Sequence, residues 1–574
     1  MKRSHRISAT SFLLSVLATG CVVPGAEEVP TDKASSALLC ADGPATKFYR
    51  DDDGDGYGVS TGTLFCDDPG VGWSDVGGDC NDHDATVHPN APEVVGDGKD
   101  SNCDGKDPDG VGPVTNTYRV VSVRVFRFCD SDGTRCSSVT REHVQQAIDS
   151  ANSYLYRSES KLRFKLSTST AVVTQGVVSA APFGTINSDS WNNECKPVSN
   201  LYEYGDIDSK GAVCPTPASD ATFDADLDKF QKAVEAAGDV PVFGRGGTED
   251  IKKIGTTWYP SAFTHGYSGC GGHAVVMTSD WSAGTFMAHE LGHYLCLPHT
   301  MPEEKVWPLS VSEASAEIAQ YVADSNLAYT DDTKVLQGVY DPDRRMTNYT
   351  GSFSYIQNYP ITDTPPDPGV DLFKSVNGDA CSPTKSSVTV PTMFTDATGK
   401  WISHDYTMTP DRSLIMSYFK CFPAYQHYTP QEVARMEAVA SPAGHRANVA
   451  QTVTAAGFNN TLNVAIPPRP SLGAGPLQWA TSAIPATGSG SPTRVRVHVD
   501  ITHPSSVNLK LVAPNGTQLT LSTPTDNPGR VKGIFYVNGS RLPKSGTWTL
   551  AVAAQYGDPS GVSGRIDDWR IEFE

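Results

Sequence analysis

Alternating apolar and polar residues mark the start of a folded body at residues 118–128, which read YRVVSVRVFRF. A period of two is typical of a strand with one buried face. Residues 140–158 follow with apolar positions at helical spacing, and Thr140 stands where an N-cap belongs. Residues 162–170, LRFKLSTST, return to strand character. The pattern predicts a strand, a helix and a second strand in this order.

Short β-type runs separated by turn residues fill the carboxyl end of the chain. They cover residues 493–501, 507–514, 517–522, 533–539, 546–555 and 567–574. Several short strands at such spacing predict an all-β sandwich.

The run AHELGHYLCLPH, residues 288–299, combines three histidines with one carboxylate. Residues four apart share a helix face, so His289 and His293 can point at one ion with Glu290 beside them. His299 cannot join them on a continuous helix, because ten residues put it roughly 15 Å along the axis. Pro298 biases the residue before it out of the helical region, so we expect the helix to stop and His299 to swing back.

This set predicts a catalytic zinc site. Three neutral imidazoles leave a fourth position for water, whose pKa falls toward about 7 on binding. Glu290 is then placed to act as general base. The alternative is a buried helix whose histidines are ordinary hydrogen-bonded residues.

Residues 411–436 read DRSLIMSYFKCFPAYQHYTPQEVARM. Together with the histidine run, this segment resembles the metzincin clan of metalloendopeptidases, and within it the pappalysin-like family, over roughly residues 117–445. The elements that carry the resemblance are Gly292 to Thr300, Asp363-Thr364-Pro365, Met416-Ser417-Tyr418, Cys421, and Thr429 to Met436.

The resemblance implies an α+β metalloprotease domain with a zinc helix, a mixed sheet and a Met-turn. It implies that Met416 packs beneath the zinc and that Tyr418 stabilises the reacting oxyanion. Cys296 stands where the family has glycine, so this residue either takes a positive φ at some cost or turns by another route. It is either a metal-competent thiolate or, as we expect, a buried cysteine or a disulfide partner of Cys270.

The amino terminus resembles an export signal. Residues 1–20 have a basic head and a short apolar stretch, which predicts a signal peptide rather than a membrane span. Cys21 follows as in a bacterial lipoprotein, so lipid attachment to the cell envelope and free secretion both stay open, with residues 21–45 as a linker. Thirteen cysteines in an exported chain imply disulfides. Plausible pairs are Cys129 with Cys136, Cys195 with Cys214, and Cys381 with Cys421.

Charge is concentrated in one segment. The chain of 574 residues is long enough for three or four domains, and its net charge of −20 argues against a nucleic-acid partner. Residues 40–110 alone hold 16 Asp, one Glu and four Lys or Arg. Acid this dense repels itself unless cations are bound.

Within a module predicted at residues 46–110, DDDGDGYG places Asp51, Asp53 and Asp55 as in the opening of a calcium loop. The usual closing Glu is absent, so further ligands must come from later acids. The stretch resembles a metal-binding repeat of bacterial surface proteins. An acidic disordered linker is the alternative.

Residues 465–574, after a linker at 446–464, resemble the P or Homo B domain that follows catalytic domains in proprotein convertases. The resemblance implies a jelly roll without chemistry of its own.

Taken together, the sequence predicts an exported zinc endopeptidase that acts on protein or peptide substrates and that also uses calcium. The alternative is a calcium-dependent cell-surface binding protein whose metalloprotease scaffold is inactive. The oligomeric state stays open.

Overall fold

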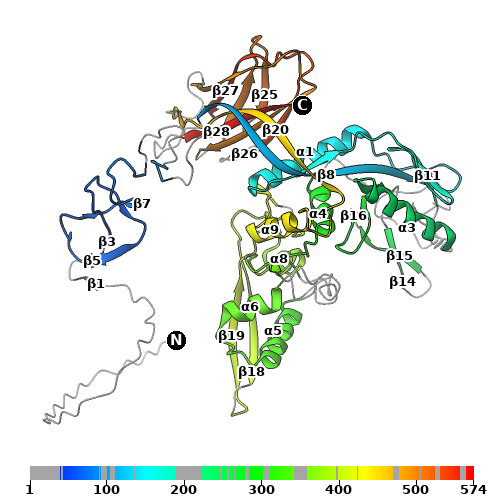
Figure 1. Cartoon of the computed structure of the whole chain (residues 1–574). Helices are drawn as coiled ribbons and strands as arrows, with labels where there is room; N and C mark the ends of the chain where they lie inside the picture. The colour runs from blue at the N-terminus through cyan, green and yellow to red at the C-terminus, as the bar shows by residue number, and fades with distance from the viewer. Residues whose placement is uncertain are drawn as a thin grey trace, which may run out of the picture. The chain divides into compact units, whose positions relative to one another are not determined.

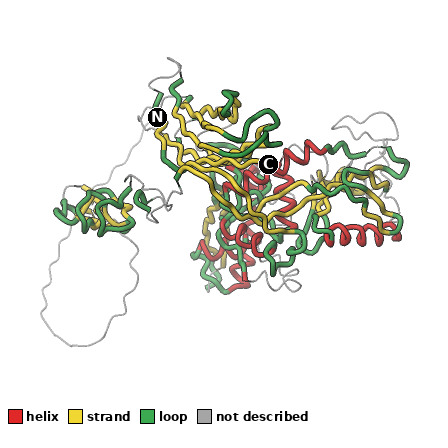
Figure 2. The backbone as a smooth tube through the Cα atoms, turned by 45° about the horizontal axis from the view of Figure 1, so that its top comes forward, coloured by secondary structure: helices red, strands yellow, loops and turns green. Residues whose placement is uncertain are grey.

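A computed structural model of the whole chain provides the fold (Figures 1 and 2). It describes residues 39–40, 43–44, 46–89, 91, 100–103, 110–134, 136–188, 221–245, 249–254, 257–263, 266–277, 284–301, 310–341, 358–395, 398–419, 421–422, 425–469, 477–503, 506–523, 531–555 and 564–574. The predicted signal peptide, Cys21, Cys195 and Cys214 lie outside these residues. The chain divides into two units, residues 1–107 and 108–574, which are described separately.

The first unit is built from short strands. They are β1 (Leu39–Cys40), β2 (Gly43–Pro44), β3 (Thr46–Arg50), β4 (Gly58–Val59), β5 (Gly62–Phe65), β6 (Trp73–Ser74) and β7 (Gly77–Asp79). β3 pairs with β5 and β6, and the ring of Phe65 packs edge to face against those of Phe48 and Trp73. A disulfide joins Cys80 to Cys103. The described part of this segment thus has regular structure, which the disordered-linker alternative does not predict.

The longest strand, β8 (Val111–Cys129), organises the second unit (Figure 1). The same sheet contains β9 (Leu162–Leu166), β12 (Thr185–Asn187), β13 (Val240–Gly244), β16 (Gly266–Tyr267), β17 (Val275–Met277), β20 (Ala450–Asn460), β21 (Val464–Ile466), β23 (Arg494–Thr502), β26 (Val531–Asn538) and β28 (Gly564–Phe573). Residues 111–121 of β8 pair antiparallel with β20, and residues 123–127 pair parallel with β13. β20 also pairs with β28. One sheet therefore runs from the helical half of the unit into the carboxyl-terminal strands.

Strands occupy two segments in which the sequence pattern predicts none. β8 begins at Val111 rather than near Tyr118, and β20 occupies residues 450–460 inside the linker expected at 446–464. Neither segment has the clean alternation that predicts a strand. The two segments pair with each other over residues 111–121 and 450–460, and this long-range pairing is invisible in local sequence.

Helix α1 (Arg141–Arg157) forms where it was predicted, and the hydroxyl of Thr140 accepts a hydrogen bond from the backbone N–H of His143 as its cap. It packs against α4 (Gly284–Tyr294), the helix that carries the histidines. A Cβ on Gly284 would lie 2.1 Å from the Cβ of Ser150, so a glycine is needed where the two helices approach. The shared core includes Val144, Ile148, Leu155, Leu291 and Ile415.

The second unit also contains further helices and antiparallel strand pairs. They are α3 (Ala221–Ala236), α5 (Val311–Ser325), α6 (Asp332–Tyr340), α8 (Val370–Asn377), α9 (Pro430–Val439), and the antiparallel pairs β10 (Val173–Gln175) with β11 (Val178–Ala180), β14 (Glu249–Ile254) with β15 (Thr257–Phe263), and β18 (Val388–Thr395) with β19 (Trp401–Met408). A second hydrophobic core lies among α5, α6, α8 and the β18–β19 hairpin. The unit is therefore mixed α and β.

All six strands predicted at the carboxyl end are present. A four-stranded sheet of β22 (Ala480–Ala486), β27 (Gly546–Ala554), β24 (Val507–Val512) and β25 (Gln518–Ser522) shares one core with β28, β23 and β26. Trp548 from one sheet and Trp569 from the other are fully buried in that core. The period-two pattern thus located both layers.

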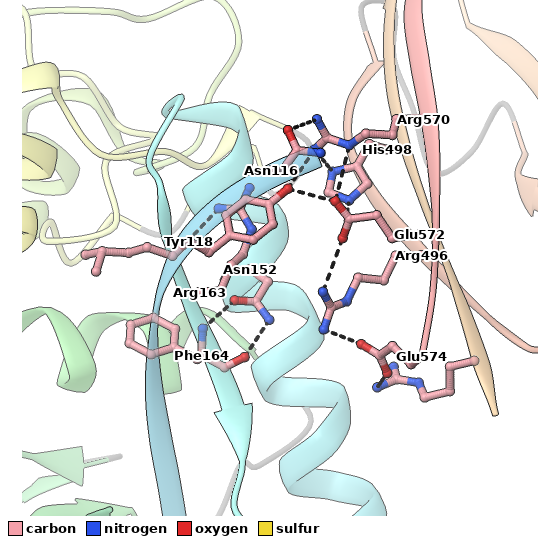
Figure 3. Close-up of polar contacts among 12 residues, drawn as sticks. Asn116, Tyr118, Asn152, Arg163, Phe164, Arg496, His498, Arg570, Glu572 and Glu574 are labelled. Atoms are coloured by element: carbon pink, nitrogen blue, oxygen red, sulfur yellow. Dashed lines mark hydrogen bonds and ion pairs between the residues drawn. The ribbon is translucent and has the colours of Figure 1, made fainter. Parts of the chain in front are cut away.

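Buried polar side chains link β8 to the carboxyl-terminal strands (Figure 3). The hydroxyl of Tyr118 donates to Glu572 at 2.8 Å, and Arg570 donates to Tyr118 at 3.0 Å and to Nδ1 of His498 at 3.1 Å. A guanidinium can only donate, so Nδ1 accepts and the proton sits on Nε2 of a neutral ring. Burial and the charge of Arg570 lower the pKa of His498 to about 3.

This buried histidine predicts acid sensitivity. An unfolded chain protonates His498 near its ordinary pKa of about 6.5, whereas the folded protein keeps the ring neutral down to about pH 3. The free energy of unfolding must therefore fall as pH falls through this window, by up to about 1.4 kcal/mol per pH unit from this residue. We expect His498→Gln to reduce the slope of the unfolding free energy, measured with urea, against pH. The reduction should be up to the equivalent of one bound proton. His143→Gln, at an exposed position, is the matched control, and parallel curves for His498→Gln and the wild type would contradict this expectation.

Candidate metal centre and catalytic site

Three imidazoles, two from α4 and one from the segment after it, meet at one point. The Nε2 atoms of His289, His293 and His299 form a triangle with sides of 3.0, 3.0 and 3.1 Å. His289 and Glu290 are buried on α4, and His299 follows the helix. The structure thus brings together the three histidines that the sequence singled out, and Glu290 directly follows His289 on α4.

Two of these rings have a fixed tautomer. Nδ1 of His289 lies 2.7 Å from the carbonyl oxygen of Ile415, and Nδ1 of His293 lies 2.7 Å from that of Leu297. Carbonyls only accept, so each Nδ1 carries the proton and each Nε2 presents a lone pair. Two lone pairs 3.1 Å apart cannot hydrogen-bond to each other. The donor set therefore fits a cation, and three imidazole nitrogens are a typical set for zinc.

The helix ends earlier than Pro298 alone would dictate. α4 stops at Tyr294, and Cys296 takes the left-handed conformation with φ of 69°. In this turn the N–H of Leu297 donates to the carbonyl of Gly292 at 2.9 Å, as in a helix C-cap. Cys296 therefore adopts the positive φ that was one of the two routes expected for it.

Cys296 is bonded to Cys270, as expected, which ties the turn to the segment before β17. The predicted pairs Cys129–Cys136 and Cys381–Cys421 are also disulfides. Disulfides of this kind are typical of exported proteins. In the described residues no helix is both long and apolar enough to span a bilayer.

The residues around Met416 pack against α4. Met416 is fully buried, and a Cβ on Gly292 of α4 would lie 2.6 Å from its sulfur. Gly292 is therefore needed for the helix to rest on this side chain. The preceding residue, Ile415, supplies the carbonyl that orients His289.

Tyr418 lies beside the histidines and is 39% exposed. Its ring centroid is 4.8 Å from that of His299 and 5.8 Å from that of His289. The Tyr418 ring therefore lies close to two of the three imidazoles.

Sequence reasoning missed a buried charged pair behind the site. Arg446 lies 3.8 Å from the ring centroid of Tyr294 and donates to Glu235 at 2.9 Å and to the carbonyl of Cys270 at 2.9 Å. The hydroxyl of Tyr294 also donates to Glu235. These contacts fasten the end of α4 to the disulfide. Arg446 and Glu235 are 211 positions apart, so no local pattern connects them.

A second cluster lies in the first unit. Ligand atoms of Asp51, Asp53 and Asp55 lie within 4.8 Å of one another, and so do those of Asp53, Asp79 and Asp82. Asp79 and Asp82 were among the later acids from which the missing ligands were expected.

The cluster carries uncompensated charge. One carboxylate oxygen on each of Asp53, Asp55, Asp79 and Asp82 is buried without a hydrogen bond among the described residues. Burial and neighbouring carboxylates raise the pKa of both Asp53 and Asp79. Asp51 instead accepts hydrogen bonds from the N–H groups of Gly54 and Gly56, so the loop wraps around it. The arrangement fits a cation with oxygen ligands.

Two family models match parts of the chain. The first, Cu-binding MopE, is described as a "Putative metal-binding motif" and matches residues 79–109; the second, "Proprotein convertase P-domain", matches residues 492–573. Both ranges lie outside the segment with the three histidines. No curated protein matches the chain.

Solved structures with some likeness are distant. A complex of Aeromonas sobria serine protease with its chaperone is 12% identical, over 32% of this chain and 36% of that one, with a TM-score of 0.16. Mature mirolysin of Tannerella forsythia with a cleaved peptide is 12% identical, over 58% and 95%, with a TM-score of 0.27. Aeromonas sobria serine protease alone is 10% identical, over 79% and 88%, with a TM-score of 0.17. The chain thus spans about a third of the first of these.

The left-handed conformation at position 296 predicts that glycine is more stabilising there than alanine. With Cys270 changed to Ala, glycine at position 296 should give a more stable protein than alanine, by about 1 kcal/mol, because only glycine takes φ of 69° without steric cost. Urea unfolding of Cys270→Ala/Cys296→Gly and Cys270→Ala/Cys296→Ala at equal metal content measures the difference. Equal stabilities would show that the turn relaxes once the disulfide is gone.

Proposed function

We propose that this protein is an exported zinc-dependent endopeptidase. The observation that carries the proposal is the triangle of Nε2 atoms of His289, His293 and His299, with Glu290 on the same helix and Tyr418 at its side. A metzincin-type domain at residues 117–445 and a jelly roll at residues 465–574 are parts of this proposal. The resemblance of the histidine and Met416 segments to pappalysin-like enzymes supports a peptide substrate over other hydrolysable groups.

The residues divide the chemistry among them. The three imidazoles hold the zinc, which when bound supplies a Lewis acid for a water molecule and a peptide carbonyl. Glu290 takes the proton of the attacking water and passes it to the leaving amine. The hydroxyl of Tyr418 donates a hydrogen bond to the oxygen that becomes negatively charged. The carbonyls of Ile415 and Leu297 accept from Nδ1 of His289 and His293 and so orient both rings with Nε2 toward the metal position.

Export is part of the same proposal. The observed disulfides and the basic, then apolar, start of the sequence support an extracellular or envelope location. Lipid attachment at Cys21 would hold the enzyme at the envelope, whereas free secretion would release it.

Removal of the proposed base tests the mechanism. We expect Glu290→Gln to keep one zinc per chain and to lower kcat on a casein or gelatin substrate by about 10²–10⁴-fold, because proton transfer is lost while the ligands stay. Phenanthroline should abolish wild-type cleavage and added zinc should restore it. Glu142→Gln, an exposed change on α1, is the matched control.

Cleavage by Glu290→Gln at the wild-type rate would refute the assigned mechanism. One bound zinc per chain in the wild type with no cleavage of any protein substrate would instead favour the surface-binding protein with an inactive scaffold.

We also propose that the first unit binds calcium. Five carboxylates, from Asp51, Asp53, Asp55, Asp79 and Asp82, offer only oxygen atoms, which suit calcium better than copper. The buried oxygens that have no hydrogen-bond partner among the described residues supply the driving force for taking up a cation.

Calcium binding predicts a cation-dependent stability. We expect Ca²⁺ to raise the melting temperature of the first unit and EGTA to lower it, because the ion binds only the folded cluster. Asp79→Asn or Asp82→Asn should weaken Ca²⁺ binding at least about tenfold in calorimetric titrations, since each removes a charged ligand from the site. Asp75→Asn, an exposed change in the same unit, is the control. Unchanged affinity in both ligand variants, or tighter binding of Cu²⁺ than of Ca²⁺, would contradict the assignment.

A further inference from the structure

Asp367 connects the third histidine to the Met416 segment. One carboxylate oxygen of Asp367 accepts hydrogen bonds from the hydroxyl of Thr300 at 2.6 Å and from the hydroxyl of Ser417 at 2.8 Å. The other accepts from the backbone N–H of Gly369 at 2.8 Å. Three segments far apart in sequence therefore converge on one carboxylate.

The two hydroxyls belong to residues that flank the site. Thr300 directly follows His299, and Ser417 directly precedes Tyr418. The N–H of Thr300 also donates to the carbonyl of Met416 at 3.2 Å. A shift at Asp367 would therefore move a predicted metal ligand and the predicted oxyanion donor together.

These contacts are sealed from water. Asp367, Thr300 and Ser417 are 2%, 2% and 0% exposed. A carboxylate is costly to bury, and hydrogen bonds to a buried charge are stronger than those between neutral groups. The carboxylate is therefore a firm anchor for both hydroxyls.

The chain holds Asp367 in place. Pro366 and Pro368 flank it and fix φ on both sides, and Gly369, with φ of 80°, is the N-cap of α8. Asp367 therefore sits in a stiff segment that leads into a helix.

His299 needs such an anchor more than the other two histidines do. His289 and His293 are on α4, whereas His299 lies beyond the left-handed turn, with the disulfide at Cys296 on one side and Thr300 on the other. We propose that Asp367 is a positioning residue that sets His299 through Thr300 and Tyr418 through Ser417. This inference rests on the proposed zinc endopeptidase function.

Two conservative substitutions test separately the contact of Asp367 with Thr300 and its contact with Ser417. Thr300→Val removes the hydroxyl beside His299 and should weaken zinc binding about 10–100-fold, as expected for outer partners of a metal ligand. The visible absorption spectrum of the Co²⁺-substituted protein should also change, because the third imidazole moves. A purely structural role would not alter that spectrum at full metal loading.

Ser417→Ala removes the other hydroxyl that donates to Asp367 and should affect Tyr418 rather than the metal ligand. Zinc affinity should stay within about twofold of the wild type, while kcat falls about tenfold or more and KM stays constant. Adding Ser417→Ala to Tyr418→Phe should cost no further activity, because Ser417 acts through Tyr418. Ser482→Ala, which removes a buried hydroxyl in the carboxyl-terminal sandwich, is the matched control.

The outcomes separate this proposal from the function on which it rests. If the wild type binds zinc and cleaves protein, but Thr300→Val and Ser417→Ala both behave like Ser482→Ala, the positioning role is wrong and the endopeptidase stands. If the wild type takes up no zinc, both are wrong. Asp367→Ala should combine the two losses, and normal metal binding in that variant would likewise overturn the proposal.

Discussion

The candidate site depends on one reversal of the chain. α4 can present only His289 and His293 to a common point, and His299 reaches that point because Cys296 turns the backbone into the left-handed region directly after the helix. A disulfide replaces the conformational freedom of glycine at this turn with a covalent anchor. Arg446 stabilises the same turn, because it packs on the ring of Tyr294 and donates a hydrogen bond to the carbonyl of Cys270. Backbone geometry, rather than the histidines alone, makes the site.

The carboxyl-terminal strands are structurally continuous with the half of the unit that carries the site. β8 and β20 pass from one part of the sheet to the other, and α1 contacts both α4 and β26. The hydroxyl of Ser153 on α1 accepts the N–H of Ile534 at 3.0 Å, while the hydroxyl of Tyr154 lies 3.2 Å from that of Thr285 on α4. The carboxyl-terminal strands thus belong to the same folded unit as the histidine helix, and a buried polar network lies between them and β8 (Figure 3).

Local sequence patterns predicted what local physics determines. The i and i+4 spacing of His289 and His293, the cap at Thr140 and the six carboxyl-terminal strands follow from periodicities within a few residues. β20 was missed because its partner lies more than three hundred positions earlier. Asp367 was missed for the same reason, since a carboxylate between two prolines has no local signature of its contacts with distant hydroxyls. The metal, the substrate and the domain limits stay predictions.

The most direct measurement is zinc K-edge X-ray absorption on the purified protein loaded with one zinc ion per chain. We expect a first shell of nitrogen and oxygen at about 2.0–2.1 Å, with outer-shell scattering from three imidazoles that drops to two in His299→Ala. A sulfur scatterer at about 2.3 Å, or a spectrum that His299→Ala leaves unchanged, would contradict this expectation, because the reversal at Cys296 would then not deliver the third ligand.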